Sequence, residues 1–178
     1  AKRALVVGDR PFMSYQIGPS EALASAGRFI TEGRAQAVKL EGGRAMAPTI
    51  RRIVRSGIPV MGHIGLTPQS VYKFGGYRLQ GRTAEEAQAL LDSARALEEN
   101  GIFALVLEKV PADVAGRIRD ALEIPVIGIG AGPQCDGQVL VIHDMLGLND
   151  KMHLKFVKCY AALGQEMRRA LDQYVKEV

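Results

Sequence analysis

The sequence predicts a parallel α/β fold and favours a (β/α)8 barrel over an open doubly wound sheet. Six short apolar runs alternate with amphipathic helical segments, which is the order of elements in a parallel sheet. The runs are almost continuously apolar, as strands buried on both faces are. Polar residues directly follow most of them, and that is where such a barrel places its chemistry.

The six predicted strands are two short of a closed barrel. In chain order they cover Leu5–Val7, Ala37–Leu40, Val60–Ile64, Ala104–Leu107, Val126–Ile129 and Val139–Ile142. Because the sequence opens almost inside a strand, we expect the first two strands of the natural barrel to be missing from it. An open sheet is the competing interpretation. Residues 1–178 are interpreted as one partial barrel domain.

Helical patterns fill the gaps between these runs. The expected helices run from Ser20 to near Gly33, through Ile50, Ile53 and Val54 to Gly57, from Thr83 to about Asn100, from Pro111 through Leu122, and roughly over Leu154–Val175. The strongest start signal is Thr83 with Glu86 three residues later, which is the spacing of a capping box. Glycines at the ends of these patterns are typical helix stops.

Two joints between a helix and the next strand share one design. Residues 57–65 read GIPVMGHIG, and residues 123–130 read EIPVIGIG. In both, a proline (Pro59 and Pro125) stands at the strand entrance, where no ladder donor is required. The repetition supports a chain built from successive βα units.

Composition excludes several classes of protein. Hydrophobic residues make up 47% and charged residues 24% of the chain, which excludes a disordered chain. No apolar run approaches the roughly 18 residues that span a bilayer. No charged and then apolar leader opens the sequence, so we expect a cytoplasmic protein with no membrane partner. Cys135 and Cys159 are too far apart for a C-x-x-C pair, which fits a reducing compartment.

The charge balance is mildly basic. Lysine and arginine number 23 against 19 acidic residues, a net charge of +4. The arginines are scattered along helical stretches, as in the group Arg51, Arg52 and Arg55, and we interpret them as solvated helix faces. A nucleic-acid partner is not expected, because such a surface would combine concentrated charge with exposed aromatic side chains.

Five polar residues follow the apolar runs: Asp9, Lys39, Glu41, His63 and Glu108. If the sheet closes, all five side chains point toward one mouth. Three carboxylates gathered there would need a compensating charge. Oxygen ligands without a thiolate favour Mg²⁺ or Mn²⁺ over zinc. Each residue alone is a weak signal, and His63 taken by itself is more often a core histidine than a ligand. Their recurrence at the same place in four βα units is what indicates a site.

Two glycine-rich stretches are less specific. Residues 128–133 read GIGAGP, in which Pro133 occupies the third glycine position of a dinucleotide-binding motif. We therefore expect these glycines to allow close approach of the backbone to a ligand or a neighbouring strand. Residues 75–82 form a long connection whose expected role is substrate cover or an interface.

Longer motifs carry a resemblance to a known family. The sequence resembles ketopantoate hydroxymethyltransferase (3-methyl-2-oxobutanoate hydroxymethyltransferase) over residues 1 to about 160. The motifs that carry it are DRPFMSY at 9–15, AVKLEGG at 37–43, PVMGHIGLTPQS at 59–70, IGIGAGP at 127–133 and CDGQVLV at 135–141. The string HIGLTPQS at 63–70 is the most specific of them.

The resemblance implies a (β/α)8 TIM barrel of the phosphoenolpyruvate/pyruvate-like group. It implies the first committed step of pantothenate synthesis, in which 5,10-methylenetetrahydrofolate donates a hydroxymethyl group to 3-methyl-2-oxobutanoate and gives 2-dehydropantoate (ketopantoate). It also implies Mg²⁺ as the cofactor and a ring-like homo-oligomer, with a decamer expected. The substrates, the pathway and the oligomeric state rest on the resemblance alone.

The resemblance also implies roles for individual residues. Asp9 matches a metal ligand that also contacts substrate, and Glu41 matches the second metal-site carboxylate. Lys39 matches the residue that binds the keto acid. Glu108 matches the proposed proton acceptor, and His63 matches a pocket residue of unassigned role. The family's earlier Gly-Asp-Ser segment, which supplies a further metal ligand and a substrate contact, has no counterpart in this sequence.

Two other functions stay open on sequence grounds. A Mg²⁺-dependent 2-oxo acid lyase or aldolase of the same barrel group would share the metal and the keto-acid site but need no folate. A non-catalytic fragment that acts as a scaffold or binds RNA through its basic balance is the second.

Overall fold

A computed structural model describes residues 3–148 and 157–178 of the chain. The chain divides into two compact units, Ala1–Gln138 and Val139–Val178, and each is described by itself. The first unit holds the sheet and the helices packed on it. The interpretation of the whole chain as one partial barrel domain stays a prediction.

The first unit is built on a six-stranded parallel sheet. Its strands are β1 (Val7–Asp9), β2 (Ala37–Glu41), β3 (Val60–Gly65), β4 (Ala104–Glu108), β5 (Val126–Ile129) and β6 (Gly137–Gln138). They pair in strict sequence order, β1-β2-β3-β4-β5-β6. A doubly wound sheet reverses its strand order at a switch point, and this sheet does not. The parallel α/β prediction is confirmed, and the order is that of consecutive strands of a barrel.

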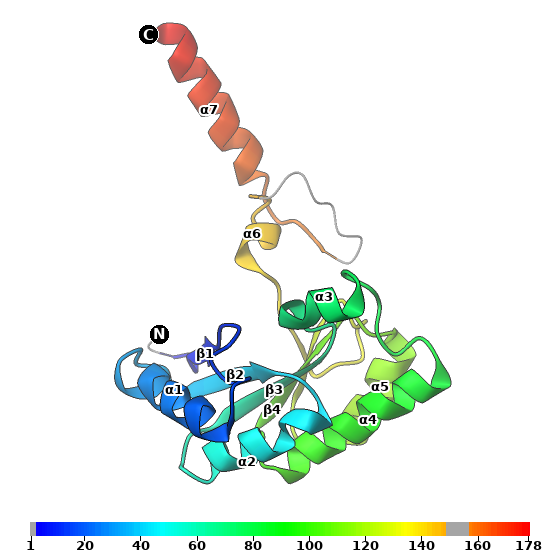
Figure 1. Cartoon of the computed structure of the whole chain (residues 1–178). Helices are drawn as coiled ribbons and strands as arrows, with labels where there is room; N and C mark the ends of the chain where they lie inside the picture. Colours follow the sequence, from blue (N-terminus) through cyan, green and yellow to red (C-terminus); the bar gives the residue numbers. More distant parts are fainter. Residues whose placement is uncertain (1–2, 149–156) are drawn as a thin grey trace. The chain divides into compact units, whose positions relative to one another are not determined.

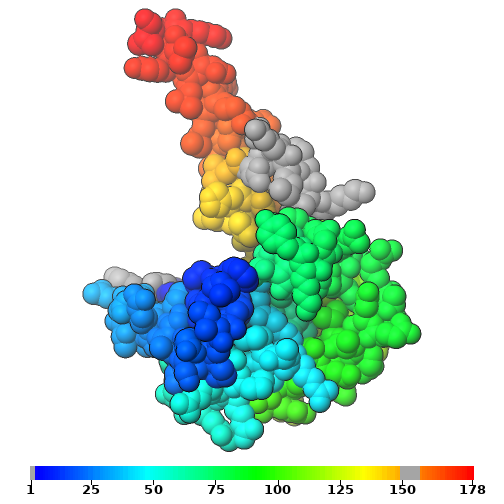
Figure 2. Space-filling view, in the orientation of Figure 1, coloured from blue at the N-terminus to red at the C-terminus, as the bar shows by residue number. Residues whose placement is uncertain are grey.

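Helices connect the strands within this unit. They are α1 (Pro19–Thr31), the 3-10 turn η1 (Arg44–Met46), α2 (Ala47–Val54), the 3-10 turn η2 (Pro68–Ser70), α3 (Val71–Phe74), α4 (Ala84–Glu99) and α5 (Ala112–Asp120). Parallel crossovers are right-handed, so a constant strand order carries the connecting helices to one face. Figure 1 shows α1, α2, α4 and α5 along the outer side of the strands, and Figure 2 shows α1 against the neighbouring surface of α2.

The hydrophobic core lies between this helical layer and the sheet. Ile50 and Ile53 of α2 are completely buried, as their helical spacing predicts. Leu97 of α4 and Ile118 of α5 are equally buried and belong to the same cluster as Leu105 of β4. At about 25 cal/mol per Å² of apolar surface removed from water, such side chains supply most of the favourable free energy of folding.

Two predicted strands are misplaced. The first strand begins at Val7 rather than Leu5, because the ladder with β2 starts at the pair Val7 and Ala37, and Leu5 is 54% exposed. The strand predicted at Val139–Ile142 is wrong. The ladder ends at Gln138, since β6 is only two residues long, and Ile142 already opens a helix. An apolar run without a partner strand does not form a ladder.

The second unit contains α6 (Ile142–Met145) and α7 (Leu163–Glu177). The sequence predicts the final helix roughly over Leu154–Val175. Residues 154–156 of that range lie outside the described part of the chain. Residues 157–162 are not helical. The amide of Tyr160 donates to the carbonyl of Met145 at 2.8 Å, and that of Leu163 to Leu146 at 3.1 Å. These bonds to the preceding segment replace the helical ones, so α7 begins later than predicted.

The stretch GIGAGP brings two segments close together. A Cβ atom added to Gly132, whose φ is +79°, would lie 2.4 Å from the Cβ of Ala112 at the start of α5. One added to Gly128 would lie 2.9 Å from the sulfur of Cys135. No helix follows within residues 130–136, whereas a dinucleotide-binding motif requires one. The expectation of close backbone approach is confirmed for neighbouring segments of this chain.

No helix within residues 3–148 and 157–178 is both long enough and apolar enough to cross a membrane.

The capping box predicted for α4 is present. The amide of Glu86 donates to the Thr83 hydroxyl at 3.2 Å, and the Glu86 carboxylate accepts from the Arg82 and Thr83 amides at 2.7 and 3.4 Å. These contacts satisfy amides that have no partner within the helix.

The variant Thr83→Ala should lower the free energy of unfolding by about 1 kcal/mol, because the side-chain acceptor at the helix N-terminus is lost. Urea denaturation followed by circular dichroism would measure the change. Thr83→Ser keeps a hydroxyl and should recover most of the stability. Equal losses in the two variants would contradict a capping role for this side chain.

Candidate active site

The five polar residues predicted from the sequence lie at the carboxyl ends of the first four strands. In the ladders, Asp9 pairs with Lys39 across β1 and β2, and Glu41 pairs with His63 across β2 and β3. Glu108 pairs with Gly65, two residues beyond His63 on β3. The parallel register therefore brings the five residues to one edge of the sheet, as expected.

A continuous chain of contacts joins the side chains. Lys39 Nζ lies 2.8 Å from Asp9 Oδ1 and 3.2 Å from His63 Nδ1. The Asp9 side chain is 62% exposed, whereas that of Lys39 is only 16% exposed. The Lys39 ammonium thus lies between an open carboxylate and a buried imidazole. Because Lys39 and Glu41 both approach the same ring, the prediction that they share one side of the strand is confirmed.

His63 is the centre of the cluster. Its side chain is 4% exposed. Nδ1 lies 3.9 Å from Glu41 Oε1, and Nε2 lies 3.2 Å from Glu108 Oε2. The second contact is close but lacks hydrogen-bond geometry, so Nε2 is a buried polar atom without a hydrogen-bond partner among the described residues.

Burial dominates the electrostatics of Glu41. Its side chain is 6% exposed, and desolvation raises the pKa of the carboxyl above its usual value. The backbone N–H of Gln69 donates to Oε2 at 3.0 Å and opposes that rise. Weaker opposing effects on the pKa come from His63 and Lys39. A buried carboxylate with few donors is a group that a cation would stabilise.

Three residues that the sequence did not single out hold this end of the sheet together. The Tyr15 hydroxyl donates to Gln69 Oε1 at 2.6 Å and accepts the Glu41 backbone N–H at 3.2 Å. Gln69 Nε2 donates to the Arg10 carbonyl at 2.7 Å. Gln69 therefore connects the segment after β1, which begins next to Asp9, to Glu41 at the end of β2.

Arg10 is an unusual member of this network because it is 1% exposed. It donates through Nη2 to the Ser14 carbonyl and lies over the Tyr15 ring, 5.3 Å from its centroid. Nε and Nη1 have no partner among the described residues. Desolvation lowers the pKa of Arg10 to about 10, as expected for a buried cation with few donor contacts.

The sequence contained a weak signal for these three residues. Each lies in one of the quoted motifs, at 9–15 or 63–70, but a glutamine or arginine is mostly exposed and a tyrosine is of intermediate burial. Only the contact between the two loops shows that they are buried together.

The donor chemistry is compatible with a hard cation but does not complete a site. Asp9 and Glu41 supply carboxylate oxygens, which Mg²⁺ prefers. Within residues 3–148 and 157–178, no group of three or more His, Cys, Asp and Glu side chains is placed to hold a metal ion. Asp9 and Glu41 could therefore contribute two ligands, with others from water, substrate or a further segment.

Comparison with known proteins gives this geometry a family. The profile of the family described as ketopantoate hydroxymethyltransferase matches residues 1–178. The chain belongs to this family.

Relatives within the family are close in sequence. The protein named 3-methyl-2-oxobutanoate hydroxymethyltransferase from Syntrophobacter fumaroxidans is 58% identical over 178 residues, which cover 100% of this chain and 63% of that protein. The protein of that name from Moorella thermoacetica is 59% identical over 98% of this chain and 65% of its own length. The one from Chlorobaculum parvum is 52% identical over 99% and 64%. The chain thus spans a little under two thirds of these relatives.

The variant Tyr15→Phe should lower the free energy of unfolding by about 1–3 kcal/mol, because it leaves the buried Glu41 N–H without its acceptor from Tyr15. Urea denaturation at neutral pH would measure the loss. Tyr72→Phe is a matched control, since Tyr72 is 97% exposed, and it should change stability by less than about 0.5 kcal/mol.

The stability difference between the unmutated chain and Tyr15→Phe should also depend on pH in the alkaline range. Burial raises the pKa of Tyr15 from 10.0 to about 12, so folding holds the proton more tightly than the unfolded chain does. Its contribution to stability is complete below pH 10 and is lost as the pH rises through about 12. The stability advantage of the unmutated chain over Tyr15→Phe should therefore shrink across this window. An advantage that stays constant with pH would contradict the burial argument.

Proposed function

We propose that the chain is the substrate-binding and proton-transfer part of a hydroxymethyltransferase. The enzyme transfers a hydroxymethyl group from 5,10-methylenetetrahydrofolate to 3-methyl-2-oxobutanoate. The product, 2-dehydropantoate, serves pantothenate and coenzyme A synthesis. The supporting observation is the convergence of Asp9, Lys39, Glu41, His63 and Glu108 at one sheet edge, in a chain of this family.

Glu108 is the base in this proposal. The reaction requires removal of the C3 proton of the keto acid, which lies next to the carbonyl group. The Glu108 side chain is 18% exposed and lies beside His63 at the end of β4. It is therefore shielded from bulk water yet open on one side, as a proton acceptor must be. His63 would orient it through Nε2, the atom that has no hydrogen-bond partner among the described residues.

Lys39 holds the anionic end of the keto acid. Its ammonium is mostly buried between Asp9 and His63, and a desolvated cation attracts a carboxylate more strongly than an exposed one does. Fixing the acid at this point would orient the C3 proton toward Glu108. Asp9, the exposed partner of Lys39, would contact substrate from the open side.

Asp9 and Glu41 would hold Mg²⁺ in this proposal. The ion supplies Lewis acidity that polarises the keto group of the acid. Gln69, after β3, donates its backbone N–H to the Glu41 carboxylate, and Tyr15, after β1, accepts the Glu41 backbone N–H, so these two contacts keep Glu41 in place. We propose that the family's Gly-Asp-Ser segment supplies the further ligand, that the intact enzyme is a phosphoenolpyruvate/pyruvate-like barrel, and that it acts in the cytoplasm as a decameric homo-oligomer.

The variant Glu108→Gln, made in the full-length enzyme, should slow exchange of the C3 proton of 3-methyl-2-oxobutanoate for deuterium by about 10²–10⁴-fold, because the side chain can no longer accept a proton. Proton NMR in deuterium oxide without folate would follow it. Glu123→Gln, at the opposite edge of the sheet before β5, is the control and should leave the exchange rate unchanged. Undiminished exchange in Glu108→Gln would remove this residue from the role of base.

Removal of metal tests the second part. Treatment of the full-length enzyme with EDTA should abolish formation of 2-dehydropantoate, and added Mg²⁺ should restore it, since the carboxylates alone cannot polarise the keto group. Chromatographic product analysis with and without methylenetetrahydrofolate would measure this. Activity that persists in EDTA rules out the metal role, and a product formed without folate would instead indicate a lyase or aldolase.

A further inference from the structure

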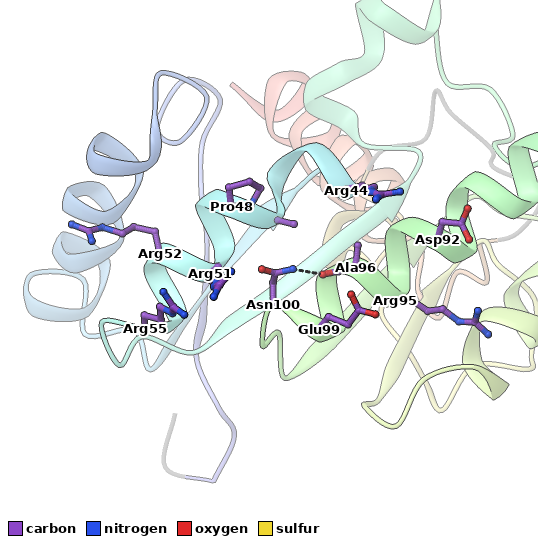
Figure 3. Close-up of a pocket in the computed structure, with 11 residues that line it drawn as sticks. Arg44, Pro48, Arg51, Arg52, Arg55, Asp92, Arg95, Ala96, Glu99 and Asn100 are labelled. Atoms are coloured by element: carbon purple, nitrogen blue, oxygen red, sulfur yellow. Dashed lines mark hydrogen bonds between the residues drawn. The ribbon is translucent and has the colours of Figure 1, made fainter.

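A second charged feature lies away from the strand ends. A hollow of about 800 Å³ lies between α4 and the consecutive elements η1 and α2. Its lining residues are Arg44, Ala47, Pro48, Arg51, Arg52, Arg55, Asp92, Arg95, Ala96, Glu99 and Asn100. We call it the arginine hollow. It shares no residue with the candidate active site (Figure 3).

The arginine hollow carries a strong excess of positive charge. Its lining contains five arginines and two acidic residues, a net charge of +3 in one place, compared with +4 for the whole chain. All five arginines are exposed. None of their guanidinium groups makes an ion pair or a side-chain hydrogen bond within the described part of the chain. The positive charge is therefore not neutralised internally.

Helix electrostatics explain only part of this gathering. Arg51 and Arg52 lie in the last turn of α2, where the helix dipole favours cations. Arg51 and Arg55 are four residues apart, however, a spacing at which like charges destabilise a helix. Arg44 precedes α2, and Arg95 belongs to a different helix. The consecutive elements η1 and α2 and the separate helix α4 thus contribute unpaired guanidinium groups to one hollow.

The centre of the hollow is distinct from its rim. Figure 3 shows Arg51 beside Asn100 in the gap between α2 and α4, whereas Arg52 and Arg95 point outward to opposite sides. Arg51 and Arg55 also line an adjoining depression with Glu99, Asn100 and Gly101. Arg51 and Arg55 are therefore the arginines best placed for contact with a bound group.

We propose that the arginine hollow binds a small anion that carries two or more phosphate groups. Guanidinium groups donate two parallel hydrogen bonds to phosphate oxygens, which is why arginine dominates phosphate recognition. A volume of about 800 Å³ is within the range of small-molecule sites. Its lining contains no aromatic residue, so it lacks the stacking surface that single-stranded nucleic acids use. This proposal assigns a ligand to arginines that the sequence alone led us to interpret as a solvated helix face.

Isothermal titration calorimetry of the chain with inorganic pyrophosphate, at about 0.15 M salt, tests the proposal without reference to enzymatic activity. We expect saturable binding at one site per chain, tighter than that of orthophosphate or sulfate. The double variant Arg51→Gln, Arg55→Gln should weaken binding by at least about tenfold, because it removes two charge-assisted contacts. Glutamine preserves helix propensity, and circular dichroism would check that the variant is folded.

Arg117→Gln is the matched control. Arg117 is an exposed arginine on α5 outside the hollow, and its replacement should leave the affinity for pyrophosphate within about twofold, as for a distant surface site. Four results would overturn the proposal: no saturable binding, equal affinity for sulfate and pyrophosphate, equal losses in the double variant and the control, or binding of a short RNA with none of pyrophosphate. The proposed enzymatic function would be unaffected by any of them.

Discussion

The register of the parallel ladder is the constraint on which the candidate site depends. The hydrogen bonds between parallel strands fix which residues lie opposite each other, so the carboxyl-terminal residues of paired strands lie side by side at one edge of the sheet. Asp9 lies beside Lys39, and Glu41 lies beside His63, because each pair is in register on neighbouring strands. A shift of one residue would turn every side chain of a strand to the other face. The catalytic proposal therefore depends on backbone pairing before it depends on any individual side chain.

Burial gives the cluster its chemical character, and pairing makes that burial tolerable. Glu41 and His63 are almost wholly enclosed, and isolated charges would be strongly destabilised there. The contacts with Lys39 and with the Gln69 amide reduce that cost. Arg10 is less well satisfied, since two of its nitrogens have no partner among the described residues. The loop after β1 thus holds two of the unsatisfied polar atoms near the site.

The two charged regions of the first unit are organised differently. At the strand ends, opposite charges are interleaved and partly buried, which suits precise positioning of a small substrate and a proton. In the arginine hollow, like charges are exposed and unpaired, which suits recognition of an external anion. The same βα units supply both, because β2 and β3 carry Lys39, Glu41 and His63 while the following helices α2 and α4 form the hollow.

The sequence by itself determined the parallel α/β class, five of the six strand positions to within a few residues, the capping box of α4 and the five polar residues of the site, because periodicity and end signals are local. It did not determine that Val139–Ile142 lacks a strand partner, that the last helix starts at Leu163, or that Tyr15 and Gln69 bind the end of β2. Only the tertiary structure decided these, since each depends on contacts between residues distant in the sequence, which no local pattern encodes.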